Sequence, residues 1–199
     1  MDLDWSGRAH TILEQTLNEI KTRLASASWN HIEETNTIAV YNTNIGNSFL
    51  AKATGTINTS PDNLVRFFSD SNNIRQWVDN LKNAIQLQQS GDVKLIKYQI
   101  QNKWPVDDRE FLYVTKSFTE GNLTYLIERS VDLPNIPTDA KHVRGDYMAG
   151  YIFEPQGGNL TKTTLVLNYD PSGNVPTAIK TSILNKQASR LKAAKVNFG

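Results

Sequence analysis

The chain has 199 residues, enough for one domain with a substantial buried core. Its 21 Lys and Arg residues nearly balance its 20 Asp and Glu residues, and a formal net charge of +1 argues against nucleic acid as a partner. Cysteine is absent, which excludes disulfides, thiolate metal sites and thiolate catalysis. The sequence has no apolar run of ~18 residues that could span a bilayer and no basic start typical of a signal peptide, so we expect a cytoplasmic protein.

An amphipathic helix is predicted near the start of the chain, over residues 7–27. Its apolar residues recur at intervals of three or four positions and form one face: Leu13, Leu17, Ile20 and Leu24. Such a face must pack on something. We therefore divide the chain into an N-terminal helical segment, residues 1–28, and a domain that spans residues 29–199.

A second helix is predicted after Ser60, a favourable N-cap residue, with Pro61 at its first position. Strand-like runs follow, separated by short polar segments that contain glycine: residues 90–92, 120–122 and 156–159. These turn signals indicate hairpins and hence an antiparallel sheet. A last helix is predicted from about residue 175 to residue 198, which spans ~36 Å at helical rise. The order favours an α+β domain in which a curved sheet wraps the final helix.

Residues 104–114 form a charged turn between two strand-like runs. Alternating apolar residues precede the turn, and Phe111 and Tyr113 share one face after it. Pro105 cannot donate a ladder hydrogen bond and favours an extended conformation at Trp104. This places Trp104 at the mouth of whatever the strands enclose.

This turn resembles the signature WPV-x-x-RDF-x-YV of START domains, the lipid-transfer modules related to the steroidogenic acute regulatory protein. The resemblance spans about residues 29–198, and its further matches are Ile38 to Tyr41, Ala51 to Ile57, Trp77, Leu133-Pro134, Val143-Arg144, Gly150 to Pro155, Thr164 to Val166 and Asp170 to Pro176. It implies a helix-grip fold, a curved antiparallel sheet wrapped around a long C-terminal helix. It also implies an internal hydrophobic cavity that binds a lipid or other amphiphile and carries it between membranes.

The residues that the resemblance and the alternation place around this cavity are mostly aromatic or aliphatic. The predicted lipid-binding set is Trp77, Tyr98, Ile100, Trp104, Phe111, Tyr113, Thr115, Arg129, Tyr147, Leu165, Ile179 and Ile183. Glu128 and Arg129 are neighbours in one predicted strand, so alternation sends one of them inward and the other to solvent. Alternation alone does not distinguish a cavity lining from an ordinary packed core.

Two arginines match arginines of the family and are expected to have structural roles. Arg109 should fix the turn by bonding to the backbone or to Asp107 and Asp108. Arg144 should lie at a rim or on the surface.

The ligand class follows from departures from the family pattern. Sterol-binding members have a buried Arg six places after the turn Arg, where this chain has Thr115, so the resemblance implies a nearly neutral inner end of the cavity. Phosphatidylcholine-binding members have Trp-Asp with an Arg three places before the Trp, whereas here Val78 follows Trp77 and Arg75 lies two places before it. We expect a phospholipid or fatty-acyl amphiphile in preference to a sterol.

The last predicted helix is basic as well as amphipathic. From Pro171 to Gly199 there is no Asp or Glu but there are five basic residues: Lys180, Lys186, Arg190, Lys192 and Lys195. Lys186, Arg190 and Lys192 are predicted to make transient contact with an anionic membrane surface. The alternative is a solvated helix face whose charge is balanced by acids elsewhere.

Catalytic patterns are weak. His10, His31 and His142 have no metal-ligand spacing, and no nucleophile or phosphate-binding motif is present. We expect no catalytic residue, no metal and no cofactor. Two alternatives stay open: a cavity enzyme of the polyketide cyclase or aromatase type that uses Tyr113, Tyr147 or Arg129, and a lipid-sensing module that regulates a partner.

Overall fold

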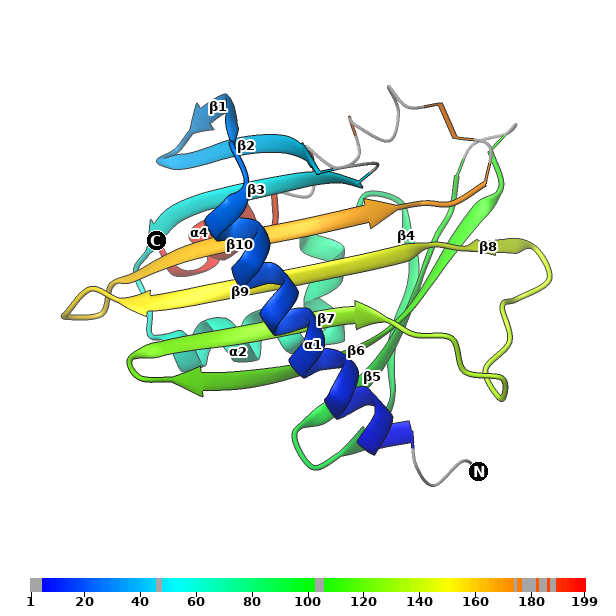
Figure 1. Cartoon of the computed structure of the whole chain (residues 1–199). Coiled ribbons are helices and arrows are strands. Elements are labelled where there is room, and N and C mark those ends of the chain that lie inside the picture. Colours follow the sequence, from blue (N-terminus) through cyan, green and yellow to red (C-terminus); the bar gives the residue numbers. More distant parts are fainter. Residues whose placement is uncertain are drawn as a thin grey trace.

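The computed structural model describes residues 5–45, 48–102, 106–173, 175–176, 182, 186 and 189–199. In this part of the chain, ten strands form one strongly curved sheet in the order β1-β2-β3-β10-β9-β7-β6-β5-β4, with β8 paired to β6 (Figure 1). The strands are β1 (Asn30–Thr35), β2 (Ile38–Ile45), β3 (Ser48–Ile57), β4 (Leu81–Ser90), β5 (Val93–Ile100), β6 (Asp108–Glu120), β7 (Leu123–Ser130), β8 (His142–Arg144), β9 (Asp146–Pro155) and β10 (Thr161–Asp170). Every pairing is antiparallel except the short pairing of β8 with β6.

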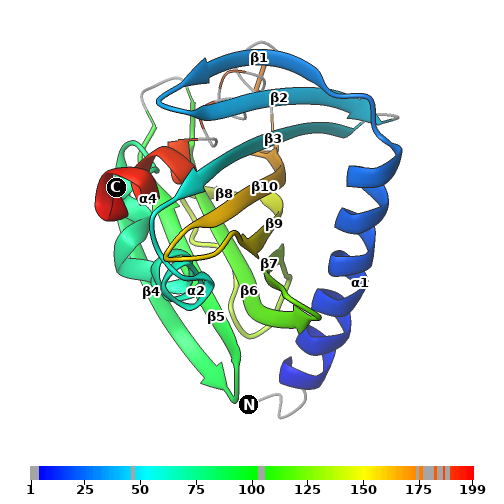
Figure 2. The ribbon, with the colours of Figure 1, turned by 90° about the vertical axis from the view of Figure 1, so that its left-hand side faces the viewer.

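Helices lie on both faces of the sheet. The helix α1 (Trp5–Ser26) crosses one face, whereas α2 (Pro61–Ser69), the 3-10 helix η1 (Ser71–Gln76) and α4 (Ser189–Phe198) lie on the concave face (Figure 2). None of the described helices is both long enough and apolar enough to cross a membrane. The helix-grip architecture predicted from the sequence is confirmed. Most of residues 177–188, in the predicted last helix, lie outside the described residues.

Local sequence signals account for the ends of several elements. The side chain of Ser60 caps α2 by accepting a hydrogen bond from the Asn63 backbone N–H at 3.4 Å, as predicted. Gly91 and Gly121 lie in the β4–β5 and β6–β7 hairpins with φ of 58° each, a backbone conformation that side chains with a Cβ disfavour. The predicted hairpins at these two turns are therefore confirmed.

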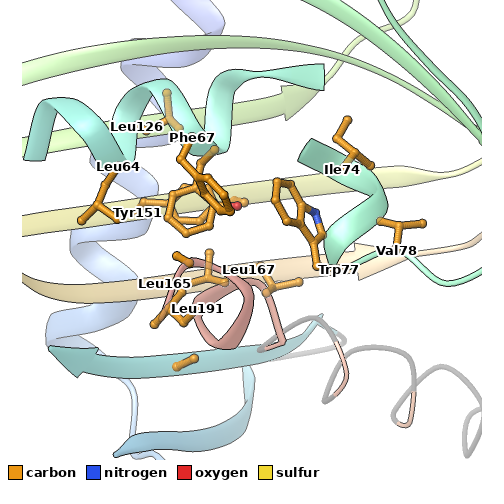
Figure 3. Close-up of a cluster of buried hydrophobic side chains, with 14 of the residues drawn as sticks. Leu64, Phe67, Ile74, Trp77, Val78, Leu126, Tyr151, Leu165, Leu167 and Leu191 are labelled. Carbon is orange, nitrogen blue, oxygen red and sulfur yellow. The ribbon is translucent and has the colours of Figure 1, made fainter. Parts of the chain in front are cut away.

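Strand alternation divides the apolar side chains into two layers. Phe111 and Tyr113 of β6 point to the concave face and join a cluster with α2, η1 and α4. Leu112 and Val114, between and after them, point to the opposite face and pack with α1. The concave layer is rich in aromatic rings, and Figure 3 shows Trp77, Tyr151 and Leu191 converging in it from the C-cap of η1, from β9 and from α4.

The contact between α1 and the sheet depends on a glycine. Ile20 is fully buried on α1, and a Cβ added at Gly150 of β9 would overlap Ile20 Cδ1 and lie 3.0 Å from Ile20 Cγ2. Gly150 therefore lets the helix approach the middle of the sheet closely.

We predict that Gly150→Ala lowers the free energy of unfolding by ~1–3 kcal/mol, because the new methyl group overpacks against Ile20. The loss should be smaller in an Ile20→Val background, where the Cδ1 atom is gone. Urea denaturation of the four proteins of this double-mutant cycle measures the coupling. An equal loss in both backgrounds would contradict the close approach.

Candidate functional site

An ion pair lies inside the sheet, in the concave layer. Arg190 of α4 and Glu128 of β7 are each 2% exposed, and Arg190 Nη1 lies 3.3 Å from Glu128 Oε2. The same Nη1 donates hydrogen bonds to the hydroxyl oxygens of Tyr147 and Tyr151, both at 2.9 Å. The guanidinium carbon lies 5.1 Å from the centre of the Tyr147 ring, a cation–π contact.

Strand register explains why the carboxylate of Glu128 points inward. Glu128 pairs with Thr115, and Thr115 has the same parity in β6 as the inward-facing Phe111 and Tyr113. Tyr147 and Tyr151 alternate on β9 in the same sense. Two neighbouring strands and α4 therefore direct their polar groups to one point in an otherwise apolar layer.

A small cavity adjoins this ion pair. Its volume is about 10 Å³, and it is lined by Ile74, Trp77, Tyr98, Tyr113, Glu128, Tyr147 and Arg190. This is room for about one water molecule. Two of these seven residues are charged and three are tyrosines, which is unusual for a core packed only for stability.

Two hydroxyl groups near the ion pair lack partners. Among the described residues, Tyr98 OH and Thr115 Oγ1 are buried and have no hydrogen-bond partner. Leaving such a group unsatisfied costs ~1–3 kcal/mol. An unpaired hydroxyl beside a polar cavity therefore marks a place where a ligand or water can bind.

Burial shifts the protonation of this cluster. Burial raises the pKa of Glu128 from 4.5 to about 7, although the neighbouring Arg190 favours the ionised carboxylate. Burial alone would lower the pKa of Arg190, but Tyr151 and Glu128 raise it overall, so the guanidinium stays charged. Burial also raises the pKa of Tyr98, Tyr113 and Tyr151. The tyrosines therefore stay neutral and can donate hydrogen bonds, and Glu128 is the group that titrates near neutral pH.

A buried ion pair is a weak source of stability, because the cost of desolvating two charges offsets their attraction. Apolar residues of similar size would serve a packed core at least as well. A strongly shifted carboxyl group with a charged partner beside a cavity is instead typical of a functional site.

A surface groove of about 690 Å³ borders Trp77. Its lining residues come from β1, β2, the end of η1 and the residues after it, and the C-terminal segment: Ile32, Glu33, Val40, Gln76, Trp77, Asp79, Ser182, Lys186, Ser189 and Lys192. Lys192 Nζ lies 3.0 Å from Glu33 Oε1, and Lys186 Nζ lies 4.0 Å from Asp79 Oδ2. Among the described lining residues, Trp77 is the one that the groove and the cavity share.

Arg109 holds two segments together at one end of the sheet. It is buried, and its guanidinium donates to the backbone carbonyls of Asp107 at 2.6 Å, Pro171 at 2.6 Å and Ser172 at 3.2 Å. The expected bond to the backbone of the turn is present, and the bonds to Pro171 and Ser172 add a link to the start of the C-terminal segment. Arg144 is half-buried and donates to Glu110 Oε1 at 2.8 Å, so it is not a simple surface residue.

The structure brings most of the predicted lining residues together. Seven of the predicted residues lie in the concave layer or pack against it: Trp77, Tyr98, Ile100, Phe111, Tyr113, Tyr147 and Leu165. Thr115 is buried beside Glu128. Trp104, Ile179 and Ile183 lie outside the described residues. Whether these side chains bind lipid stays a prediction.

Three expectations need correction. Arg129 points away from the cavity and lies 3.8 Å from the exposed Asp146, because its neighbour Glu128 takes the inward position. Arg190 was predicted on a membrane-facing surface, but it is buried in the cavity wall. The inner end of the cavity holds an ion pair and is not free of charged groups, because Arg190 supplies from α4 the cation that Thr115 does not supply from β6.

Sequence reasoning missed Tyr151 and the partnership of Glu128 with Arg190. The pattern held a signal for Arg190: it follows Ile183, a predicted inward residue, by seven positions, which is two turns of a helix. For Glu128 the signal was its spacing of two from Leu126, which also points inward. The pairing itself needed the register between β6 and β7.

We predict that replacing Glu128 by Gln changes how stability depends on pH. The folded-state pKa of about 7 exceeds 4.5, so the wild type loses stability as the pH rises from about 4.5 to about 7, whereas the glutamine does not titrate. The free energy of unfolding of the variant, relative to that of the wild type, should therefore rise through this pH window by on the order of 3 kcal/mol. Urea denaturation at pH 5, 6, 7 and 8 measures the difference. If the wild type instead became more stable relative to Glu128→Gln as the pH rises, Arg190 would be holding the pKa of Glu128 low.

Comparison with known proteins agrees with this architecture. A sequence model of the START domain family matches residues 13–197. Human StAR-related lipid transfer protein 5 has a similar structure, with a TM-score of 0.80 and 16% identity over 97% of this chain and 99% of that chain. A StAR-related lipid transfer protein fragment from Xanthomonas axonopodis gives a TM-score of 0.75 and 19% identity over 86% of this chain and 98% of that chain. Human STARD10 gives a TM-score of 0.74 and 16% identity over 89% of this chain and 76% of that chain.

The search of curated proteins gives no match. Structural likeness at these identities establishes the fold alone, but the family model matches nearly the whole chain. The chain belongs to the START domain family.

Proposed function

We propose that this protein binds one amphiphilic lipid inside the curved sheet and carries it between membranes. The observation that supports this most directly is the ion pair of Arg190 and Glu128, each 2% exposed within an aromatic, apolar layer. An amphiphile matches such an interior, because its polar end can meet the ion pair and the tyrosine hydroxyls while its apolar part lies against the rings. The names of the similar lipid transfer proteins point the same way.

Binding requires rearrangement of the lining. A lipid-sized ligand needs a cavity of several hundred Å³, whereas the cavity beside Arg190 has about 10 Å³. Trp77 lines both this cavity and the groove of about 690 Å³. A change of rotamer at Trp77 would join the two spaces, so we place the access route of the ligand between η1 and the C-terminal segment.

The rim of the groove suits a contact with anionic lipid head groups. The exposed Lys186 and the half-buried Lys192 are paired with Asp79 and Glu33. A membrane surface can compete for such cations, at about 1 kcal/mol for each basic residue near the surface. In this proposal the ion pairs close the groove in solution and exchange for lipid phosphates at the membrane. Arg190 takes no part in this contact, since it faces the interior.

The ligand class is broader than the sequence suggested. The case against sterols rested on the absence of a cavity ion pair, and Arg190 and Glu128 form one. The proposal therefore covers amphiphiles with a small polar group that can reach this ion pair. The phospholipid or fatty-acyl class no longer follows from Thr115.

We predict that the protein extracts one amphiphile per chain from vesicles. Purified protein is incubated with vesicles that contain phosphatidylcholine, an anionic phospholipid, free fatty acid and cholesterol, then separated from them and analysed by native mass spectrometry. A one-to-one complex that disappears after organic extraction is expected. The loaded protein should then deliver its lipid to acceptor vesicles, faster at low salt than at high salt.

Arg129→Gln is the matched control, because it removes a charge next to Glu128 on the opposite face of the same strand. It should leave occupancy unchanged. Protein that stays empty after incubation with every lipid would contradict the proposal, and turnover of an aromatic polyketide by empty protein would favour a cyclase. Stable occupancy without delivery would favour a sensing module.

A further inference from the structure

We propose that the site selects an amphiphile that ends in a carboxylate, which replaces Glu128 beside Arg190 while Glu128 takes up one proton from solvent. This inference rests on the proposed function, because it specifies the polar end of the ligand. It makes binding of the ligand and protonation of the protein a coupled event. No covalent bond forms or breaks in this exchange.

The geometry of Arg190 shows why Glu128 can be displaced. Arg190 Nη1 lies near three acceptors, and the carboxylate is the most distant, at 3.3 Å against 2.9 Å for each tyrosine hydroxyl. A nitrogen of this type has only two hydrogens. A well-formed hydrogen bond between guanidinium and carboxylate measures about 2.7–2.9 Å. The two tyrosines therefore hold this nitrogen, and Glu128 is the most distant of its three acceptors among the described residues.

The hydroxyl groups of the cavity and of the ion pair beside it favour a ligand rich in acceptors. Tyr98 OH and Thr115 Oγ1 have no partner among the described residues. Tyr147 and Tyr151 accept from Arg190, which leaves each hydroxyl hydrogen available for donation. Glu128 is the acidic residue among the described residues that line the cavity. These hydroxyl groups therefore offer more donors than the described residues have acceptors for. A carboxylate supplies two acceptor oxygens and an alcohol supplies one, whereas an alkylammonium supplies none.

Charge balance requires the proton. Two ionised carboxylates beside Arg190 would leave a net negative charge in a buried site, which is costly. Protonation of Glu128 restores neutrality and turns it into a donor. The other titratable groups around the ion pair are Tyr98 of β5, Tyr113 of β6, Tyr147 and Tyr151 of β9, Tyr169 of β10 and Arg190 of α4. Ile74 and Trp77, which reach the cavity from the η1 region, do not titrate.

The protonation of Glu128 in the free protein supports this exchange. Its pKa of about 7, raised by burial, means that little free energy is needed to protonate it near neutral pH. The negative charge of a bound carboxylate would raise this pKa further. Tyr98 and Tyr113 are already neutral, because burial raises the pKa of each well above its ordinary value. The proton therefore goes to Glu128.

The test uses four ligands with the same twelve-carbon chain: dodecanoate, dodecanol, dodecyl phosphate and dodecyltrimethylammonium, each below its micelle concentration. Isothermal titration calorimetry at pH 6 and pH 8, in buffers with different ionisation enthalpies, measures both affinity and the number of protons taken up. Dodecanoate should bind most tightly. It should take up close to one proton at pH 8 and far less at pH 6, with affinity that falls by up to tenfold per pH unit above about 7.

Dodecanol should bind more weakly, without proton uptake and without dependence on pH. In Glu128→Gln, proton uptake by dodecanoate should vanish and its affinity should no longer fall above pH 7, whereas Arg129→Gln should behave as the wild type. If Glu128→Gln does not fold, the proton uptake and the pH dependence of the wild type still test the inference.

Three results would overturn the inference: dodecanol binding as tightly as dodecanoate, dodecyl phosphate binding more tightly than dodecanoate, or dodecanoate binding at pH 8 without proton uptake. If none of the four ligands binds while vesicle lipid is still extracted, the carboxylate inference fails and lipid binding stands. If neither occurs, the proposed function fails as well.

Discussion

The contact between Arg190 and Glu128 joins the last helix to the middle of the sheet, and the rest of the concave layer is arranged around it. Taking both charges out of water is expensive, so the surroundings must compensate. Tyr147 and Tyr151 do this from β9 by accepting hydrogen bonds from the guanidinium. The same burial that makes the pair costly raises the pKa of Glu128 to about 7. Burial of this pair therefore affects both the stability of the interior and its protonation.

The two faces of the sheet have separate tasks. On the outer face, α1 packs through aliphatic side chains, and Gly150 allows the close approach of Ile20. On the concave face, aromatic and polar side chains surround a small cavity, and Trp77 lines both this cavity and the groove. In the proposed function, the concave layer repacks around the ligand while α1 keeps the outer layer covered.

The sequence predicts the fold well, because hairpin turns, the Ser60 cap and strand alternation are local signals that tertiary contacts do not reverse. It also predicts Tyr98, Phe111 and Tyr113 as inward residues, since each follows from the parity of its strand. The polar centre was not predictable in the same way. Choosing between Glu128 and Arg129 required the register of β7, and the expected neutral interior assumed that its cation must come from the position of Thr115. Several basic residues in one helix suggest a solvated face, yet one of them, Arg190, is buried and pairs with the carboxylate of Glu128.

The central claim is that the buried ion pair binds the polar end of the ligand. It is tested most directly by lipid occupancy, measured by native mass spectrometry, in the charge-free double variant Arg190→Met with Glu128→Leu. Replacing a buried ion pair by apolar residues often leaves a protein folded, so the variant should keep its structure. The control is Arg129→Met with Asp146→Leu, which removes an exposed pair from the outer face. Our account predicts at least a tenfold loss of bound lipid in the first variant and none in the control. Equal occupancy in a folded charge-free variant would contradict it.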